Sequence, residues 1–263
     1  VEEPYLIHLT YTSNASKKPL KRVALVGKGV TFDSGGLSLK PPDSMAEMKV
    51  DMAGGAIVLG LFRALMLIDL PLEIHGLIPA CENMPGGGAT RPGDIVTSAG
   101  GKTIEIANTD AEGRLILADT LSYASRTIKP DIIIDVATLT AAAMVALGED
   151  IAALMTTDDK LAASLMSASE NTGENLWRLP QPKEYLAKYR SDVADIKNVH
   201  DDKWGGAIMG GIFLQEFVDT SIPFAHIDVA GPVWSKKGNR PYNPKGATGY
   251  GVRMLLAWLK SLD

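Results

Sequence analysis

NTDAEGR, at residues 108–114, places two carboxylates and a guanidinium within a few positions of one another, directly before an apolar helical pattern. The carboxylates of Asp110 and Glu112 converge on one point only where the backbone is extended or irregular, as at a junction between a strand and a helix. Hard divalent cations prefer such oxygen ligands. The alternative is an acidic first turn that complements the dipole of the following helix. The segment therefore indicates a strand-to-helix junction, with either a metal site or a capped helix.

Short apolar runs rich in β-forming residues alternate with helical patterns on both sides of this segment. The alternation is typical of an α/β fold whose sheet is covered on both faces. The expected buried strands are residues 22–27, 73–80, 131–137 and 224–230. The expected helices, in which apolar residues recur near the helical period, are residues 53–67, 114–127, 161–170, 207–219 and 247–262. Residues 82–101, rich in Gly and Pro, are expected to form a long functional loop.

The composition fits one large domain, although two remain possible. The chain has 263 residues, of which 46% are hydrophobic, so it can bury a sizeable core. Its formal net charge is −5, and it has no cluster of Lys and Arg. A protein that mainly grips nucleic acid needs a basic face, so we do not expect nucleic acid as a main partner.

Three features favour a soluble protein in a reducing compartment. Cys81 is the single cysteine, which excludes an intrachain disulfide and a zinc site built on several cysteines. The longest uncharged apolar stretch, residues 136–148, is shorter than the roughly 20 residues that a membrane span needs. The first residues carry no basic segment of the kind that begins a signal peptide. We therefore expect a cytoplasmic protein without a membrane partner.

Two further segments place charged residues at similar junctions. Residues 26–40, VGKGVTFDSGGLSLK, pass from a strand pattern into a Gly-rich loop, and residues 48–56, MKVDMAGGA, place Asp51 alone before a long helical run. Together with residues 108–115, these segments resemble the M17 family of leucyl aminopeptidases, also called cytosol aminopeptidases. The resemblance runs from about residue 22 to the C-terminus and covers nearly all of the catalytic half of that family.

The resemblance implies an α/β fold with a mixed central sheet, helices on both faces and a dinuclear metal site at the strand ends. We expect residues 1–263 to form one metallo-aminopeptidase catalytic domain, without the family's separate N-terminal domain. Because the chain starts at Val1 rather than Met, a fragment, a processed product or an isolated domain is expected. Similar enzymes are hexamers, so the resemblance also implies a homo-oligomer.

The resemblance implies two divalent metal ions and assigns their ligands. Lys28, Asp33, Asp51 and Glu112 are expected to hold the tighter ion, and Asp33, Asp110 and Glu112 the exchangeable one. The four carboxylates match two dications in charge, whereas without cations they would repel one another and take up protons. Two metals about 3.5–4 Å apart can share a water whose pKa falls toward ~7. Zinc or manganese is expected, and magnesium or cobalt would also fit such ligands.

Nitrogen ligands are scarce in the sequence. Lys28 must lose its proton before it can bind a metal, because an ammonium has no lone pair, and burial beside a dication favours that loss. The alternative is a solvated lysine in a turn at residues 27–29, while the pattern of a phosphate-binding loop is not matched. The histidines are scattered, and structural roles are expected for His8, His75, His200 and His226.

Lys40 and Arg114 are the expected catalytic residues. By resemblance, Lys40 stabilises the oxyanion that forms from the scissile carbonyl, which lowers the barrier because the contact strengthens in the transition state. The planar fork of Arg114 suits a carboxylate-shaped anion, and in similar enzymes that anion is a bicarbonate that serves as general base. The alternative for Arg114 is a structural ion pair with Asp110 or Asp119.

The pocket for the first substrate side chain is also assigned by resemblance. Met48, Thr138, Ala141 and Ala247 are expected to line it. The family commonly reads Thr-Leu-Thr-Gly where this chain reads TLTA at residues 138–141, so a methyl group is added at the wall. A change of that size is worth about 1–3 kcal/mol of discrimination, and a preference for leucine is therefore not assured.

Together with these residues, the resemblance implies a metal-dependent aminopeptidase that hydrolyses the N-terminal residue of unblocked peptides. In the expected mechanism the free α-amine binds one metal, which sets the register, and a metal-bridging hydroxide attacks the carbonyl. Two alternatives stay open. One is a DNA-binding accessory or regulatory role, as in some similar proteins, and the other is a different dinuclear hydrolase such as a phosphoesterase.

Overall fold

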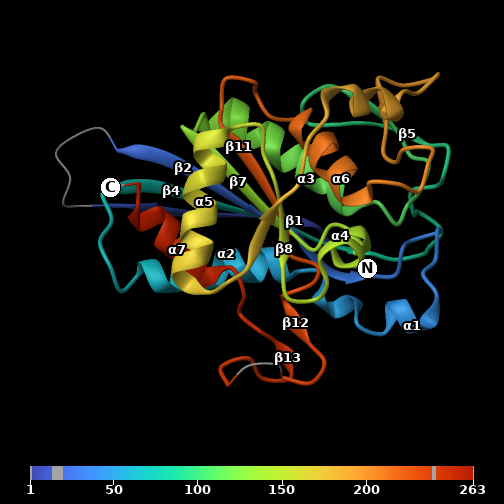
Figure 1. The fold of residues 1–263 in the computed structure, drawn as a ribbon. Helices are drawn as coiled ribbons and strands as arrows, with labels where there is room; N and C mark the ends of the chain where they lie inside the picture. The colour runs from blue at the N-terminus through green and yellow to red at the C-terminus, as the bar shows by residue number, and fades with distance from the viewer. Residues whose placement is uncertain (1, 14–19, 239–240, 263) are drawn as a thin grey trace.

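The computed structural model describes residues 2–13, 20–238 and 241–262, and a central sheet of eight strands organises them (Figure 1). The strand order is β1-β4-β2-β7-β11-β8-β9, with β3 paired to β4. The strands are β1 (Tyr5–Thr12), β2 (Lys21–Gly27), β3 (Gly29–Asp33), β4 (Leu72–Asn83), β7 (Ile132–Ala137), β8 (Ala152–Met155), β9 (Leu176–Arg178) and β11 (Phe224–Asp228).

The strand directions make the sheet mixed. The four neighbouring strands β4, β2, β7 and β11 are parallel. β1 is antiparallel to β4 at one side, and β8 is antiparallel to β11 toward the other. The prediction of a mixed α/β fold is confirmed, and the four predicted strands all lie within this parallel centre.

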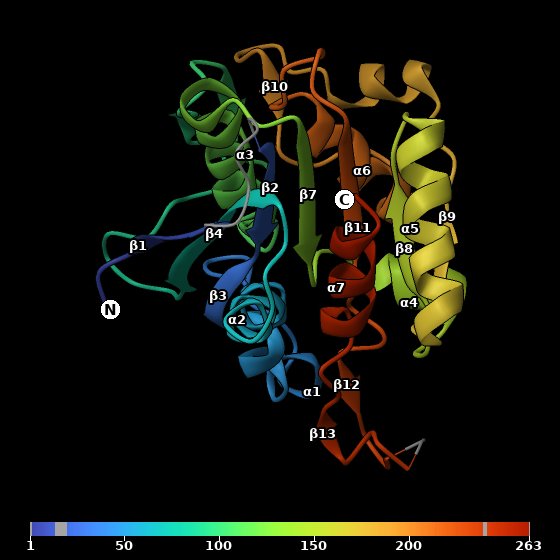
Figure 2. The same cartoon turned by 90° about the vertical axis from the view of Figure 1, so that its left-hand side faces the viewer.

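Helices cover both faces of the sheet (Figure 2). α2, α5 and α7 pack through one apolar cluster, and α3 and α6 pack through another. The helices are α1 (Pro42–Met45), α2 (Ala53–Leu65), α3 (Gly113–Tyr123), α4 (Ala141–Leu147), α5 (Asp159–Thr172), α6 (Gly206–Gln215) and α7 (Val252–Lys260). None of those in the described ranges has the length and apolar character of a membrane span.

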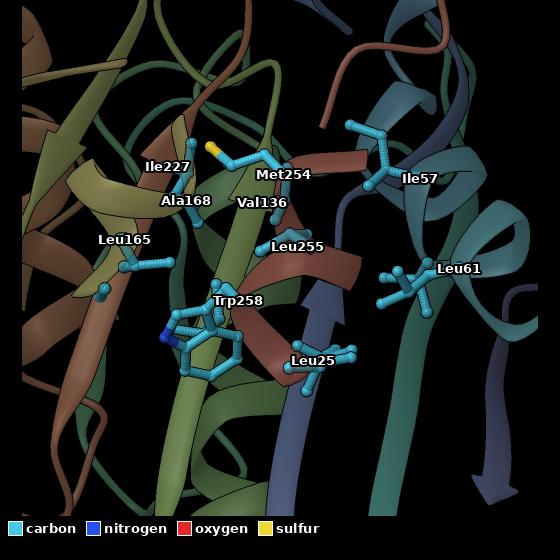
Figure 3. Packing of buried hydrophobic residues seen from close by; sticks show 14 of the residues in the cluster. Leu25, Ile57, Leu61, Val136, Leu165, Ala168, Ile227, Met254, Leu255 and Trp258 are labelled. Carbon is cyan, nitrogen blue, oxygen red and sulfur yellow. The ribbon is translucent and has the colours of Figure 1, made fainter. Parts of the chain in front are cut away.

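The alternation of side chains along β2 explains the two clusters. Val23 and Leu25 belong to the first cluster, whereas Ala24 and Val26 belong to the second. Successive strand residues point to opposite faces, so a strand covered on both sides is apolar at every position. Figure 3 shows the first cluster, in which Trp258 of α7 lies among residues of the sheet, α2 and α5.

Short elements complete the described chain. They are a three-stranded sheet of β5 (Ile95–Thr97), β6 (Thr103–Glu105) and β10 (Ile196–Lys197), and a hairpin of β12 (Trp234–Ser235) and β13 (Gly246–Ala247). Met48–Val50 and Lys183–Tyr189 are 3₁₀ helices, and Ala124–Ile128 is a π-helical continuation of α3. The expected loop at residues 82–101 is therefore interrupted, because β4 continues to Asn83 and residues 95–97 pair with β6.

The expected helix at residues 247–262 begins five residues later than predicted. Ala247 lies in β13, and α7 starts at Val252. Between them Gly249 and Gly251 have φ angles of +71° and +91°, a backbone conformation that ends a regular helical pattern. The apolar periodicity alone extends the predicted helix too far toward the N-terminus, because glycine does not interrupt it.

One of the expected structural histidines is fully enclosed in the sheet. His226 of β11 and Asp135 of the neighbouring strand β7 are opposite each other and both inaccessible to solvent. The ring Nδ1 hydrogen-bonds with a carboxylate oxygen of Asp135. Neither residue lines the cavity described below, which agrees with a structural role.

Candidate metal and catalytic site

The charged residues singled out in the sequence meet where the parallel strands end. Lys28 lies between β2 and β3, Asp33 is the last residue of β3, and Thr138 follows β7. Asp51 precedes α2, and Glu112 precedes α3. Carboxyl ends of neighbouring parallel strands open onto the same edge of a sheet, so segments far apart in the sequence deliver side chains to one place.

An inner cluster consists of Lys28, Asp51 and Glu112. The Nζ atom of Lys28 lies 2.7 Å from Asp51 Oδ2 and 2.9 Å from Glu112 Oε1. It also donates to the backbone carbonyl of Thr138 at 3.3 Å, and the Thr138 hydroxyl donates to Asp51 Oδ1 at 2.8 Å. The Lys28 and Asp51 side chains are 4% and 5% exposed, so almost no water reaches these charges.

An outer cluster consists of Lys40, Asp33 and Asp110. The Nζ atom of Lys40 lies 2.8 Å from Asp33 Oδ2 and 2.6 Å from Asp110 Oδ1. Asp33 is as buried as the inner residues, but the Asp110 side chain is 32% exposed. The outer cluster therefore has the composition of the inner one, a lysine between two carboxylates, but it opens toward solvent.

Asn83 joins the two clusters, although the sequence did not single it out. Its side-chain nitrogen donates to Asp33 Oδ1 at 2.9 Å and to the Thr109 carbonyl at 3.0 Å, and lies 3.5 Å from Glu112 Oε2. Asn83 is opposite Asp33 in the pairing of β3 with β4. In the sequence, only a predicted strand that continued beyond residue 80 could have indicated that Asn83 lies beside Asp33.

Two glycines permit the close approach of the segments. A Cβ atom on Gly113 would lie 2.4 Å from Cε of Lys28, so any other residue at the start of α3 would displace the lysine. Gly35 has a φ angle of +85°, and a Cβ there would lie 2.4 Å from the Ser38 carbonyl oxygen. Both positions require glycine for steric reasons.

The charges of the inner cluster depend on one another. Burial alone would favour a neutral Lys28, but the carboxylates of Glu112 and Asp51 outweigh it and raise the pKa of Lys28 above its usual value. Burial raises the pKa of Asp51 to about 7, against the opposing effect of the Lys28 ammonium. A cation is thus required among these carboxylates, and here the lysine ammonium supplies it.

The donor set fits divalent metal ions. Asp33, Asp110 and Glu112 can each offer an oxygen such that the three atoms lie within 4.8 Å of one another. Asp51 and Lys28 adjoin this group through the contacts with Glu112. Carboxylate oxygens suit hard and borderline dications, and a dication would take over the charge compensation that the Lys28 ammonium provides.

Arg114 is buried at the start of α3 and is held by neutral groups. Its Nη1 donates to the Tyr189 hydroxyl at 3.1 Å and to the Asn198 carbonyl at 2.8 Å. Its Nε has no hydrogen-bond partner among the described residues. Asp110 and Asp119 bind other groups, so the structural ion pair considered for Arg114 is absent from the described contacts. The guanidinium keeps capacity to bind an anion.

A cavity of about 760 Å³ lies over both clusters. Met48, Thr138 and Ala141 line it as expected, together with Lys40 and Arg114. Ala247 does not line it, because this residue lies in the exposed hairpin strand β13 rather than at the start of a helix. The sequence assigned no catalytic or substrate-binding role to several other residues of the wall, among them Asn108, Ala111, Leu139, His200 and Ala230.

Comparison with known proteins identifies the family. The model of the cytosol aminopeptidase family, catalytic domain, matches residues 1–256. A probable cytosol aminopeptidase from Chlorobium limicola is 52% identical over 243 residues, which cover 92% of this chain and 48% of that protein. Its counterpart from Synechococcus sp. (strain CC9311) is 53% identical over 259 residues, which cover 98% of this chain and 51% of that protein. The chain therefore spans about half the length of the curated relatives it matches.

Solved structures agree with this family assignment. The bottromycin maturation enzyme BotP in complex with Mn superposes with a TM-score of 0.93 at 46% identity and covers 99% of this chain and 56% of that one. The cytosol aminopeptidase from Coxiella burnetii gives a TM-score of 0.91 at 44% identity, with 99% of this chain and 55% of that one covered. On its sequence, its fold and the residues gathered at the strand ends, the chain belongs to the cytosol aminopeptidase (M17) family, within the catalytic domain of that family.

Proposed function

We propose that this chain carries the catalytic site of a metal-dependent aminopeptidase, which removes the first residue of peptides that have a free α-amine. The observation that carries the proposal is the meeting of the inner and outer clusters beneath one cavity. Residues 1–263 would form a single catalytic domain. The relatives named above are aminopeptidases, which does not favour a DNA-binding role or a phosphoesterase.

The metal ligands are proposed as the sequence predicted them. Lys28, Asp33, Asp51 and Glu112 would hold one divalent ion, and Asp33, Asp110 and Glu112 a second. The manganese complex of BotP supports manganese, zinc is the other main candidate, and magnesium or cobalt would suit the same donors. When bound, the ions would supply Lewis acidity and a water of lowered pKa.

Lys40 is proposed to stabilise the oxyanion. Its ammonium lies at the open side of the site and lines the cavity, within reach of a peptide carbonyl. Although burial opposes its charge, hydrogen bonds to Asp110 and Asp33 raise the pKa of Lys40 above its usual value. It therefore stays protonated and places a positive charge where the carbonyl oxygen becomes negative.

Arg114 is proposed to hold the anion that moves the proton. Its fork is fixed by Tyr189 and Asn198, while Nε is free of hydrogen-bond partners in the described structure and the residue lines the cavity. A planar anion such as bicarbonate would match the remaining donors. When bound there, such an anion would supply general acid–base chemistry, and the role of Arg114 would be to hold and orient it.

The substrate's first side chain is proposed to lie against Met48, Thr138 and Ala141. Ala230, just after β11, replaces Ala247 in this proposal because it lines the cavity and Ala247 does not. The methyl group of Ala141 takes up room that glycine would leave, so a smaller first residue would be favoured over a bulky one.

A cytoplasmic location and a hexamer are proposed by family resemblance. The relatives are named cytosol aminopeptidases, which supports the location.

Comparison of three chromogenic substrates tests the function. Purified protein with manganese or zinc should hydrolyse leucyl-p-nitroanilide but neither its N-acetylated form nor p-nitrophenyl phosphate. Glu112→Gln should abolish the leucyl activity, and Asp119→Asn, which removes a carboxylate of α3 that does not line the cavity, should retain it. Hydrolysis of the phosphate ester, or full activity of Glu112→Gln, would refute the proposal.

A further inference from the structure

Two histidines meet on adjoining strands at the β1 side of the sheet. In the antiparallel pairing of β1 with β4, His8 is opposite Leu77 and His75 is opposite Thr10, so the histidines are diagonal neighbours on one face. His8 Nε2 and His75 Nδ1 lie 2.9 Å apart, and the ring centroids 5.2 Å. Neither residue lines the cavity of the metal-dependent site.

The second nitrogen of His75 has a carboxylate partner. His75 Nε2 lies 2.8 Å from Glu73 Oε1, and Arg22 Nε holds the same carboxylate oxygen at 2.6 Å. An ionised carboxylate only accepts hydrogen bonds, so the neutral His75 ring carries its proton on Nε2 and has a lone pair on Nδ1. This arrangement, an imidazole oriented by a carboxylate on its far side, is the usual surrounding of a histidine that binds a metal.

The spacing of the facing nitrogens suits a shared metal ion. With metal–nitrogen bonds of about 2.0–2.1 Å, two ligands at angles of about 90–110° are about 2.9–3.4 Å apart. We propose that His8 Nε2 and His75 Nδ1 form a second metal site for a borderline transition ion such as Cu²⁺, Ni²⁺ or Zn²⁺. The ion replaces the proton between the rings, and His8 adopts its other neutral tautomer with that proton on Nδ1. The remaining coordination positions are taken by water.

The two kinds of site differ in ligand chemistry. The strand-end site offers carboxylate oxygens and a single amine, a set that accepts manganese or magnesium, whereas paired imidazoles favour copper, nickel and zinc. Access also differs. His8 is exposed on β1, which has a neighbour on only one side in the described sheet, so an ion reaches the pair from solvent (Figure 2).

Electron paramagnetic resonance of bound Cu²⁺ tests the site, because nitrogen hyperfine splitting counts the imidazoles that bind copper. Protein saturated with Mg²⁺, which is silent and avoids imidazole, is titrated with Cu²⁺. We expect a copper signal with two imidazole nitrogens. Either His8→Gln or His75→Gln should remove that signal and raise the Kd at least about tenfold, while Glu73→Gln, which keeps both ligands, should raise it by about tenfold.

His200→Gln is the matched control, since His200 lies in the cavity wall and should not affect the two-nitrogen signal. Thermal unfolding of each variant without metal checks that the fold is retained. A two-nitrogen signal that persists in both His8→Gln and His75→Gln would overturn the proposal. So would a wild-type signal that never exceeds one nitrogen, or one that disappears in His200→Gln.

Discussion

The inner and outer clusters contain the same groups but differ in depth. Each has a lysine between two carboxylates, yet the inner Lys28 and Asp51 side chains are almost completely buried, while Asp110 of the outer cluster is about one-third exposed. A buried carboxylate without a nearby cation is strongly destabilising, whereas a partly exposed one is still solvated. In the proposed function, depth distinguishes the buried Lys28, which would exchange its proton for a metal ion, from Lys40, which would remain an ammonium facing the substrate.

The largest effect is expected where the two clusters meet. Glu112 contacts Lys28 of the inner cluster and, with Asp33 and Asp110, forms the group of converging oxygens. Glu112→Gln or Asp33→Ala should lower kcat/KM for leucyl-p-nitroanilide by at least about 1,000-fold, or about 4 kcal/mol in transition-state stabilisation. Circular dichroism and steady-state kinetics with excess manganese would measure this. If either variant retains wild-type kcat/KM, the clusters do not form one catalytic site.

The next effect distinguishes Lys28 from Lys40 by the unfolding free energy that is lost when each is replaced. In metal-free protein, Lys28→Met leaves two buried carboxylates without their cation and should cost about 3 kcal/mol of unfolding free energy. Lys40→Met should cost about 1 kcal/mol or less, because its partner Asp110 is partly solvated and its buried partner Asp33 keeps the hydrogen bonds from the Gly35 N–H and the Asn83 side chain. Urea unfolding in the presence of a chelator compares the two. Equal losses in both variants would show that depth does not distinguish the clusters.

A smaller effect concerns the retention of metal. Asp51 belongs only to the proposed tighter site and Asp110 only to the exchangeable one. Dialysis of wild-type protein against a mild chelator should leave one ion per chain, and Asp110→Asn should reach the same state without a chelator. Asp51→Asn should weaken the retained ion by at least about tenfold. Metal analysis after dialysis would measure the loss, and an unchanged metal content of Asp51→Asn would contradict the assignment.

The smallest effect is expected for Glu73, a partly exposed carboxylate outside both clusters. It serves as a reference for the buried carboxylates. Hydrogen bonds from Arg22 and then His75 hold the pKa of Glu73 below its usual value. A carboxylate with a lowered folded-state pKa stabilises the protein above its unfolded pKa, and this contribution is lost as the pH falls through the folded value. Because the Glu73 side chain is one-quarter exposed, Glu73→Gln should cost only about 0.5 kcal/mol at pH 7.

Unfolding free energies of this variant and of the wild type should converge at acid pH. A difference that instead grows on acidification would show that Glu73 does not act as an ionised partner of Arg22.

Local patterns predicted the central part of the fold because strand and helix periods depend on neighbouring residues. The runs at residues 22–27 and 131–137 form parallel strands that are buried on both faces. The prediction missed β1, β3, β8 and β9 of the central sheet. β1 is mostly exposed and the other three have only three to five residues, so none has a strong apolar period. It also placed Ala247 in a helix, since two glycines with positive φ do not interrupt an apolar period, and the resemblance separately assigned this residue to the pocket.

The sequence by itself determined which chemical groups this protein could bring to a site, since NTDAEGR and the segments around Asp33 and Asp51 carry their charges irrespective of the fold. Only the tertiary structure decided how deep each charge lies, that Asn83 joins the two clusters, and that His8 meets His75. The physical reason is the range of the interactions. Residue type and periodicity are local properties, whereas burial and convergence follow from strand pairing between segments distant in the chain.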